Sequence, residues 1–522
     1  MSKSLKTVLA LWETARPLIQ EGYQVLDKTL VMGIPATSMP AADKDHDTGI
    51  GSPYGDGAKR IWRFWQDVVH KVMIGPIGKT DAATWHSPYL SLWQYNPFFI
   101  DLEQLVQQKK LSATTLNKIY RHHKKDTYID FKQVEADYMM VLKEAHQKAK
   151  SPLPFAKFCD QLVREQMQSN PFAYIGEIPI NIPKNISTIH PHWFLQDWSM
   201  GAPPDLYSPE PQMWGFPILE PNKVLKPTPT RTTPIKKTLR RLLRFYLSGC
   251  KGGVRIDHFI GWVDPYCFYQ GERNYPNGRL HSSAHIFPLQ KYAFQKDEDF
   301  LRLTQEYLTP LFDEFHLSNM DIYPEDLGVR PPQMDVALQA LNWGKMIPAQ
   351  FNEPDNDAHM YHAAHAADKD IVVLSTHDNP SLFHFFQELQ EPKKSLFAEQ
   401  LARDLRFQFN QDLCDPQWLY RMQWAAALAS PARRVTAFFT SMTGQEGRYN
   451  IPGTLDSWHL RCQRDFELGY FKALKKRQAY NPFEAIRWAI YARGDAFFHA
   501  HEKLVHQLME AEQHLFKALK DL

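Results

Sequence analysis

The sequence lacks a membrane span and the common metal-binding and phosphate-binding motifs. Of its 522 residues 43% are hydrophobic, yet no stretch reaches the roughly 18 consecutive apolar residues of a transmembrane helix. The five cysteines are scattered without a C-x-x-C pair, which indicates reduced thiols and excludes both a zinc knuckle and a disulfide framework. No glycine-rich phosphate loop of a standard pattern occurs, since Gly55-Asp-Gly57 fits neither common form.

The chain also has almost no excess charge. Sixty Lys and Arg residues oppose 58 Asp and Glu residues, for a net charge of +2, so neither nucleic acid nor an anionic membrane surface is expected as a partner. The apolar stretch near the N-terminus is interrupted by Glu13 and Arg16, which predicts an amphipathic helix and not a secretion signal. Together with the reduced thiols this predicts a cytoplasmic protein with a neutral ligand. The oligomeric state is not indicated.

Eight short apolar runs bounded by turn residues predict β-strands, and amphipathic helical patterns lie between several of them. Strand and helix alternation predicts a parallel sheet, and eight units predict an α/β fold of the (β/α)8 TIM-barrel type, interrupted by helical and loop insertions. The predicted strands are 29–34, 71–77, 172–180, 254–257, 320–325, 345–351, 371–376 and 436–442.

The predicted domain organisation is an N-terminal helical segment, 1–28, followed by a catalytic barrel over 29–522. A charged helical stretch predicts an insertion at about 90–165. The segment at about 181–235 is rich in proline and without periodicity, which is typical of a long binding loop beside a catalytic site.

Carboxylates follow three of the predicted strands. Asp257, Glu325 and Asp378 each stand at the end of an apolar run. A (β/α)8 barrel places its catalytic groups at the carboxyl ends of its strands, so the three acids should converge at one mouth. An acid at one strand end is typical of a cap or turn, but three in register favour acid/base and nucleophilic chemistry on a sugar.

The surroundings of the acids predict different roles. Arg255 lies two residues before Asp257 and should share its face of the strand, which would lower the pKa of Asp257 and favour it as a nucleophile. Glu325 follows a Tyr-Pro pair that would desolvate it and keep it protonated as a proton donor. Asp378, beside His377, would stabilise positive charge on the sugar ring. Asp326 points the other way and should be structural.

His258 and His377 could also be metal ligands, as in metal-dependent barrel hydrolases. Neither of the two stands in an H-x-H or H-E-x-x-H motif, so no metal and no other cofactor is expected.

At these acids the sequence resembles the amylomaltase or disproportionating-enzyme family of 4-α-glucanotransferases, relatives of the α-amylases. Asp257 in Arg-Ile-Asp-His-Phe resembles the family nucleophile, Glu325 in Glu-Asp-Leu-Gly its acid/base, and Asp378 in Thr-His-Asp-Asn its transition-state-stabilising aspartate. Further similar blocks, in order, are Ser87-Pro-Tyr89, Gly201-Ala-Pro-Pro-Asp205 through Gln212-Met-Trp-Gly215, and Arg448-Tyr-Asn450-Ile-Pro-Gly-Thr454 with Trp458.

The resemblance implies further substrate-binding residues. Tyr89 and Trp214 would contact glucose rings, which suits flat apolar rings with polar tips, although core packing is the alternative for both. The residues expected to bind sugar hydroxyls or position the acids are Ser87, Glu177, Asp205, Gln212, Arg255, His258, His377 and Asn450. Four positions depart from the family pattern, and subsite geometry should depend on them. Glu177 stands where the family usually has Asp, Phe216 where it has Asn, Ile260 where it has Arg, and Pro380 where it has Asp.

The resemblance therefore implies a 4-α-glucanotransferase that moves α-1,4-glucan segments between maltooligosaccharides by a retaining double displacement. The insertion at 90–165 and the loop at 181–235 would exclude water from this reaction. Two alternatives remain open: an α-1,4-glucan hydrolase with the same acids, and a non-catalytic glucan-binding protein.

Overall fold

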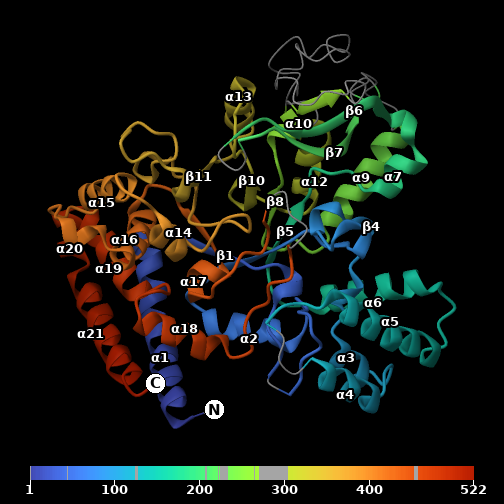
Figure 1. Cartoon of the computed structure of the whole chain (residues 1–522), viewed down its shortest axis with the longest axis horizontal. Helices are drawn as coiled ribbons and strands as arrows, with labels where there is room; N and C mark the ends of the chain where they lie inside the picture. The colour runs from blue at the N-terminus through green and yellow to red at the C-terminus, as the bar shows by residue number, and fades with distance from the viewer. Residues whose placement is uncertain are drawn as a thin grey trace. The chain divides into compact units, whose positions relative to one another are not determined.

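The structure is a computed structural model that describes residues 2–43, 45–123, 127–205, 209–220, 223, 233–263, 265–269, 304–451 and 457–522. Its internal contacts divide the chain into two compact units (Figure 1). Unit 1 comprises Met1–Ile74, Pro97–Asn170 and Ile347–Leu522, and unit 2 comprises Gly75–Asn96 and Pro171–Met346. The substrate loop and the Pro-Gly-Thr block of the sequence analysis lie in part outside the described residues.

Unit 1 is built on four parallel strands in the order β2-β1-β13-β12. The strands are β1 (Thr29–Gly33), β2 (Lys71–Gly75), β12 (Ile371–Val373) and β13 (Arg434–Phe438). Leu30 of β1 stands opposite Val435 of β13, and both are fully buried. Runs of apolar residues without alternation are typical of parallel strands covered on both faces.

Helices surround these strands, and α1 shows how the sequence forms them. Ser2 caps its N-terminus by accepting a hydrogen bond from the Leu5 N–H, and its buried residues recur every three to four positions, from Val8 through Trp12 to Leu26. That buried face packs on α19 and α21. The helices of unit 1 are α1 (Lys3–Leu26), α2 (Asp56–Trp65), α3 (Leu102–Gln107), α4 (Ala113–His122), α5 (Phe131–Lys148), α6 (Phe155–Ser169), α14 (Leu382–Glu388), α15 (Lys393–Asp404), α16 (Pro416–Ala429), α17 (Phe439–Thr443), α18 (Phe466–Lys475), α19 (Pro482–Ala492), α20 (Asp495–Ala500) and α21 (Glu502–Leu519).

Unit 2 carries three parallel strands in the order β5-β8-β10 (Figure 1). These are β5 (Tyr174–Ile178), β8 (Gly253–Ile256) and β10 (Ile322–Pro324). At Gly253, φ is +139° and a Cβ atom would lie 2.5 Å from the Asp321 carbonyl oxygen, so only glycine fits where β8 begins beside β10. The helices of this unit are α7 (Lys184–Ile189), α9 (Pro234–Leu247), α10 (Ile260–Val263), α12 (Thr309–Glu314) and α13 (Pro332–Ala340).

A second, antiparallel sheet of unit 2 corrects one expectation. The segment 181–235 was predicted to be irregular, but it contains β6 (Phe194–Ala202) and β7 (Gln212–Leu219), which pair with each other, and β6 also pairs with β9 (Tyr266–Tyr269). Pro217 and two irregularities in the register of β6 and β7 hide the alternation that identifies strands in a sequence. A short pair, β3 (Gly78–Lys79) and β4 (Leu92–Tyr95), completes the unit.

All eight predicted strands coincide with observed ones, the sixth being β11 (Met346–Pro348), where the chain passes from unit 2 to unit 1. Each prediction extends past the carboxyl end of the observed strand. The largest differences are in the sixth and the last, where residues after Pro348 form the 3-10 turn Ala349–Phe351 and residues after Phe438 form the buried helix α17, because an apolar run alone cannot distinguish a strand from a buried helix. All five cysteines are buried and free. Among the described residues, every helix is too short or too polar to cross a bilayer.

Candidate active site

Arg255 stands at the centre of a buried cluster of charges in unit 2. Its guanidinium contacts Glu177, lies 3.3 Å from an Asp257 oxygen through Nη1, and donates to Glu325 at 2.7 Å through Nη2. Arg255 and Glu177 are 6% and 2% exposed, so these charges are withdrawn from water and must compensate one another. One arginine thus holds two of the three predicted catalytic acids.

The register of the parallel strands produces this arrangement. Glu177 on β5 stands opposite Arg255 on β8, and Arg255 stands opposite Tyr323 on β10. Side chains two residues apart on a strand share a face, so Asp257 points to the same side as Arg255, as predicted. Glu325 follows the last residue of β10, which places its carboxylate at the carboxyl end of the strand.

Backbone N–H groups complete the carboxylate contacts. The His258 N–H donates to Glu325 Oε2 at 2.9 Å, and the Ile180 N–H donates to Asp257 Oδ2 at 3.2 Å. His258 has φ of +40°, a left-handed conformation that costs free energy in a residue other than glycine. In this conformation the His258 N–H points toward Glu325.

The pKa shifts of the two acids are opposite in direction to the prediction. Burial, and then the negative charge of Glu325, raise the pKa of Asp257 well above its usual value. Burial alone would raise the pKa of Glu325, but the Arg255 guanidinium and the His258 N–H lower it to about 2. The sequence shows that Arg255 is near Asp257 but not that its closer contact is with Glu325.

Aromatic side chains lie beside this cluster. The Tyr89 hydroxyl accepts a hydrogen bond from Arg255 Nη1 at 3.3 Å, and Trp214 lies with its ring centroid 4.7 Å from that of His258, edge to face. Trp214 Nε1 donates to Gln212 Oε1 at 3.4 Å. The half-buried Trp214 ring also packs on the hydrophobic cluster of the antiparallel sheet, which supports the alternative of core packing, while its contact with a glucose ring stays a prediction.

The remaining predicted residues of unit 2 lie on neighbouring turns. Ser87 precedes the short 3-10 turn Pro88–Leu90 that carries Tyr89. Asp205 follows β6 and lies beside Gly328, three residues after Glu325. Asp326 is fully buried, accepts the Met346 N–H at 2.8 Å and pairs with Arg330 at 3.1 Å, so it is structural as predicted.

Unit 1 contains a separate cluster around Asp378. Asn450 Nδ2 donates to Asp378 Oδ1 at 2.5 Å, and His377 Nε2 lies 3.3 Å from Asp378 Oδ2. The Asn450 N–H also donates to the His377 carbonyl at 3.0 Å, so the turn after β12 and the loop after α17 hold each other. The His377 ring lies against Trp458, with centroids 5.3 Å apart. The predicted residues of this unit are therefore brought together.

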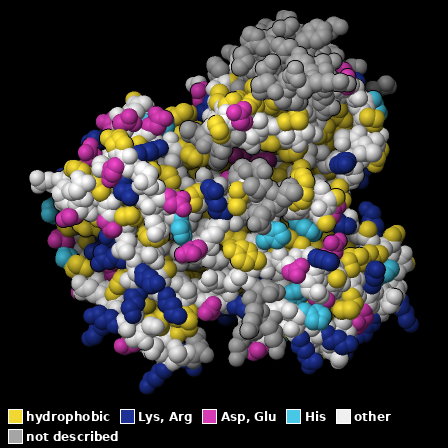
Figure 2. All heavy atoms as spheres, in the orientation of Figure 1, with side chains coloured by type: hydrophobic (Ala, Val, Ile, Leu, Met, Phe, Trp, Pro, Cys, Tyr) yellow, Lys and Arg dark blue, Asp and Glu magenta, His cyan; other side chains and the backbone are white. Residues whose placement is uncertain are grey.

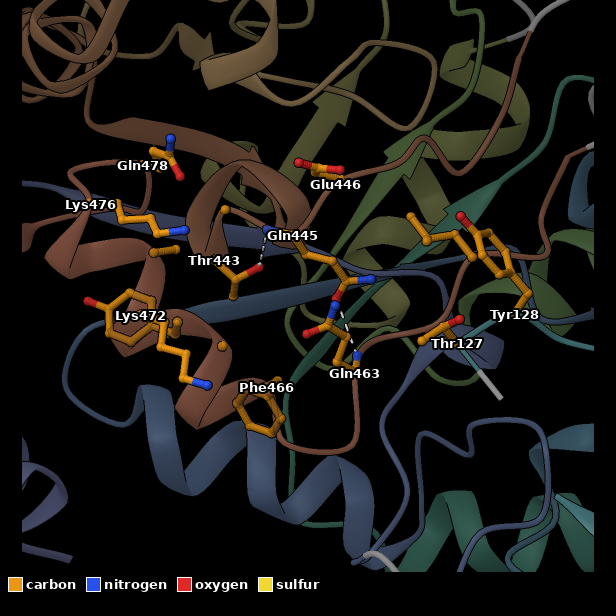
Figure 3. A pocket seen from close by; sticks show the side chains of 15 residues that line it. Thr127, Tyr128, Thr443, Gln445, Glu446, Gln463, Phe466, Lys472, Lys476 and Gln478 are labelled. Carbon is orange, nitrogen blue, oxygen red and sulfur yellow. Dashed lines mark hydrogen bonds between the residues drawn. The ribbon is translucent and has the colours of Figure 1, made fainter. Parts of the chain in front are cut away.

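Gln445, which the sequence analysis missed, fixes the base of the loop that carries Asn450 and Trp458. Its Nε2 donates to the Arg461 carbonyl at 2.6 Å, and its Oε1 accepts the Gln463 N–H at 3.2 Å (Figure 3). The amide therefore joins the two ends of the loop beside an open hollow of about 400 Å³. No local motif marks such a residue, because its partners lie 16 and 18 residues further along the chain.

The four departures from the family pattern have separate structural roles. Glu177 forms an ion pair with Arg255. Phe216 packs on the hydrophobic cluster, with its ring centroid 5.6 Å from that of Trp214. Ile260 is 1% exposed in α10, and the Pro380 carbonyl accepts a hydrogen bond from Gln350 at 3.2 Å. Each substitution is thus accommodated within its own unit.

Acidic and basic side chains are interspersed over the face shown in Figure 2. Within the described residues, no group of three or more His, Cys, Asp or Glu side chains is placed to hold a metal ion.

Comparisons with known proteins identify the family of the chain. The sequence profile of the 4-alpha-glucanotransferase family matches residues 34–164 and 161–466. The chain is 23% identical over 504 residues to a 4-alpha-glucanotransferase of Synechocystis, and 24% identical over 493 residues to one of Thermus thermophilus. These alignments cover 80% and 78% of this chain and 91% of each relative. Against a 4-alpha-glucanotransferase of Chlamydia pneumoniae, 24% identical over 309 residues, the match spans only 52% of the relative and 56% of this chain.

Two solved structures share the fold. An amylomaltase from Corynebacterium glutamicum has a TM-score of 0.64 at 16% identity, over 91% of this chain and 77% of that one. An amylomaltase from Streptococcus agalactiae in complex with acarbose has a TM-score of 0.61 at 16% identity, over 90% of this chain and all of that one. The fold is an interrupted (β/α)8 barrel, as predicted. The chain belongs to the 4-alpha-glucanotransferase family, which confirms the predicted family and enzyme class.

Proposed function

We propose that this chain transfers α-1,4-glucan segments between maltooligosaccharides by a retaining double displacement, with Asp257 as the nucleophile, Glu325 as the acid/base and Asp378 as the transition-state-stabilising aspartate. The observation that carries this proposal is that a single guanidinium, Arg255, contacts both Asp257 and Glu325. Carboxyl groups of an inverting enzyme stand roughly 6.5–9.5 Å apart to admit water, whereas those of a retaining enzyme stand about 5–5.5 Å apart. Two acids on one guanidinium fit the retaining arrangement.

In the first step an Asp257 oxygen attacks C1 of the donor glucose, and the bond between C1 and the leaving O4 breaks. Glu325 gives its proton to that O4, and a glycosyl ester remains on Asp257. In the second step Glu325 takes the proton of an acceptor 4-hydroxyl, whose oxygen attacks C1 and displaces Asp257. Asp378, held by Asn450, stabilises positive charge on the ring in both transition states.

These roles require the proton to move when substrate binds. Without substrate the two carboxyls hydrogen-bond each other, with the pKa of Asp257 raised by burial and by Glu325, and that of Glu325 lowered by Arg255. A glucose ring between them would break that hydrogen bond, place the scissile oxygen beside Glu325 and leave Asp257 ionised next to Arg255. The coupled pair therefore has to hold one proton for the enzyme to be active.

Incubation with maltotriose alone tests the proposal. Transfer should produce glucose together with a ladder of longer chains, whereas a hydrolase with the same acids would only shorten the substrate. A non-catalytic glucan-binding protein would leave maltotriose intact. Asp257→Asn should abolish both products, and turnover at the parent rate by that variant would refute the assignment of the nucleophile.

A further inference from the structure

A turn of the helical insertion pairs with the chain that leaves the Asp378 cluster. Tyr128, between α4 and α5, forms an antiparallel bridge with Leu460. Backbone hydrogen bonds of 2.7 and 3.1 Å flank this bridge. Both segments belong to unit 1, so the contact lies within one compact unit. The insertion is thus attached to the chain just after Trp458, a residue of the cluster.

His459 adds a side-chain contact to this bridge. Its carbonyl accepts the Ile129 N–H at 2.7 Å, and its Nδ1 lies 2.9 Å from the Ile129 carbonyl oxygen. A carbonyl oxygen can only accept, so Nδ1 carries the hydrogen and donates it. The imidazole also lies against Phe131, the first residue of α5, with ring centroids 5.2 Å apart. The side chain of His459 is thereby held on the insertion by a hydrogen bond and by a ring contact.

Trp458 contacts the Asp378 cluster, whereas its neighbour His459 contacts the insertion. The Trp458 N–H donates to the Tyr449 carbonyl at 2.5 Å, and its ring centroid lies 5.3 Å from that of His377. The φ of Trp458 is +68°, in the left-handed region. This conformation is costly for a residue with a bulky side chain and persists only where the surrounding contacts impose it. His377 supplies such a contact on one side, and His459 ties the next residue to the insertion on the other.

The position of Asp378 depends on His377. The His377 Nε2 atom lies 3.3 Å from Asp378 Oδ2, and the His377 carbonyl accepts the Asn450 N–H at 3.0 Å. Because the His377 ring contacts both Trp458 and Asp378, a shift of Trp458 would change how the carboxylate is held. A displacement of about 1 Å in a catalytic group can cost roughly 100-fold in rate.

We propose that His459 is a positioning residue for the transfer reaction, because it ties the helical insertion to Trp458 and through His377 to Asp378. Its effect on rate rests on the proposed function, whereas the contacts themselves do not. The insertion thereby supports the aspartate that would stabilise positive charge on the sugar ring.

Two variants of equal size isolate the hydrogen bond of His459. Asparagine and leucine have similar volumes, but only asparagine can donate from a position close to that of Nδ1. His459→Leu should lower kcat for maltotriose by roughly 10- to 100-fold with little change in KM, because the loss falls on the transition state. His459→Asn should retain most of the parent kcat. His459 is only half-buried, so the fold accommodates both side chains.

A histidine elsewhere in the insertion provides the matched control. His146 Nε2 lies 2.8 Å from the Leu153 carbonyl oxygen, and its ring centroid lies 5.0 Å from that of Phe158. His146→Leu therefore removes the same kinds of contact from the insertion, but none that involves Trp458 or the chain beside it. This variant should have the kcat and KM of the parent.

Amide hydrogen exchange in the full-length protein tests the same contacts without catalysis. The Asn450 N–H is protected by its hydrogen bond to the His377 carbonyl. His459→Leu should speed its exchange by roughly 2- to 10-fold, the equivalent of one hydrogen bond. His459→Asn and His146→Leu should exchange Asn450 at the parent rate.

The two measurements separate this inference from the proposed function. A parent enzyme that leaves maltotriose intact would refute the proposed function, while the exchange of Asn450 would still test the contacts of His459. If the parent is active and His459→Leu matches it in kcat or in the exchange of Asn450, His459 does not position the cluster. Equal losses in His459→Leu and His459→Asn would also overturn the proposal, because the hydrogen bond to Ile129 would then have no role.

Discussion

Arg255 donates to Glu325 at 2.7 Å but lies 3.3 Å from Asp257, so the arginine favours the ionised form of Glu325 over that of Asp257. Because the two carboxyls also repel each other, the pair behaves as a single titrating unit with one retained proton. Activity should depend on that proton.

Glu177→Gln should shift the alkaline limit of activity to lower pH. The negative charge of Glu177 contributes to the raised pKa of Asp257, after burial, Glu325 and the opposing effect of Arg255. Removal of that charge should let the carboxyl pair lose its last proton about one pH unit earlier. The measurement is kcat/KM for maltotriose against pH. Glu314→Gln, in an exposed ion pair with Arg244, is the control and should leave the profile unchanged.

Glu325→Gln should reduce maltotriose turnover by roughly 10²- to 10⁴-fold, the usual contribution of a general acid. With α-maltosyl fluoride the leaving group needs no proton, so formation of the glycosyl ester should be largely retained. Asp257→Asn should be inactive toward both donors. If Glu325→Gln lost activity by the same factor toward maltotriose and toward α-maltosyl fluoride, Glu325 would not be the general acid.

Asp257→Asn should be more heat-stable than the parent, by an amount that grows with pH. Because the folded-state pKa of Asp257 is raised above its unfolded value of about 3.9, the stability associated with its bound proton is present below pH 4 and lost as pH rises through the folded pKa. The difference in Tm between variant and parent should therefore be small at pH 4 and increase toward higher pH. If the difference in Tm between variant and parent were the same at every pH, the raised pKa of Asp257 would not be its cause.

Gln445→Leu should lower kcat/KM for maltotriose by roughly 10- to 100-fold while leaving the fold intact, because the loop with Asn450 and Trp458 loses the amide that joins its ends. Gln478→Leu makes the same chemical change in the same hollow and should be close to the parent (Figure 3). The order of the loop can be followed by the fluorescence of Trp458. Similar activities of the two variants would mean that Gln445 does not position the loop.

Local sequence signals were sufficient for much of this structure. Apolar runs and turn residues predicted all eight strands, since burial on both faces requires continuous hydrophobic stretches. Alternation along β8 placed Arg255 and Asp257 on one face. Both signals depend only on residues within a few positions of each other.

Long-range relationships were the part that the sequence did not reveal. The pairing of β6 with β9 joins segments about 70 residues apart. The N–H of His258, whose backbone is strained, donates to the carboxylate of Glu325, 67 residues later in the chain. Arg255 lies closer to Glu325 than to Asp257 because of ångström-scale differences in how neighbouring strands are placed, and the sequence does not show such differences. Gln445 carries no motif because its partners are backbone groups, which every residue has.

His377 contacts both flanks of the loop that follows Gln445, because its carbonyl accepts the Asn450 N–H and its ring lies against Trp458. A substitution that moves His377 would therefore release Asn450 and Trp458 together, whereas Gln445 holds only the base of the loop.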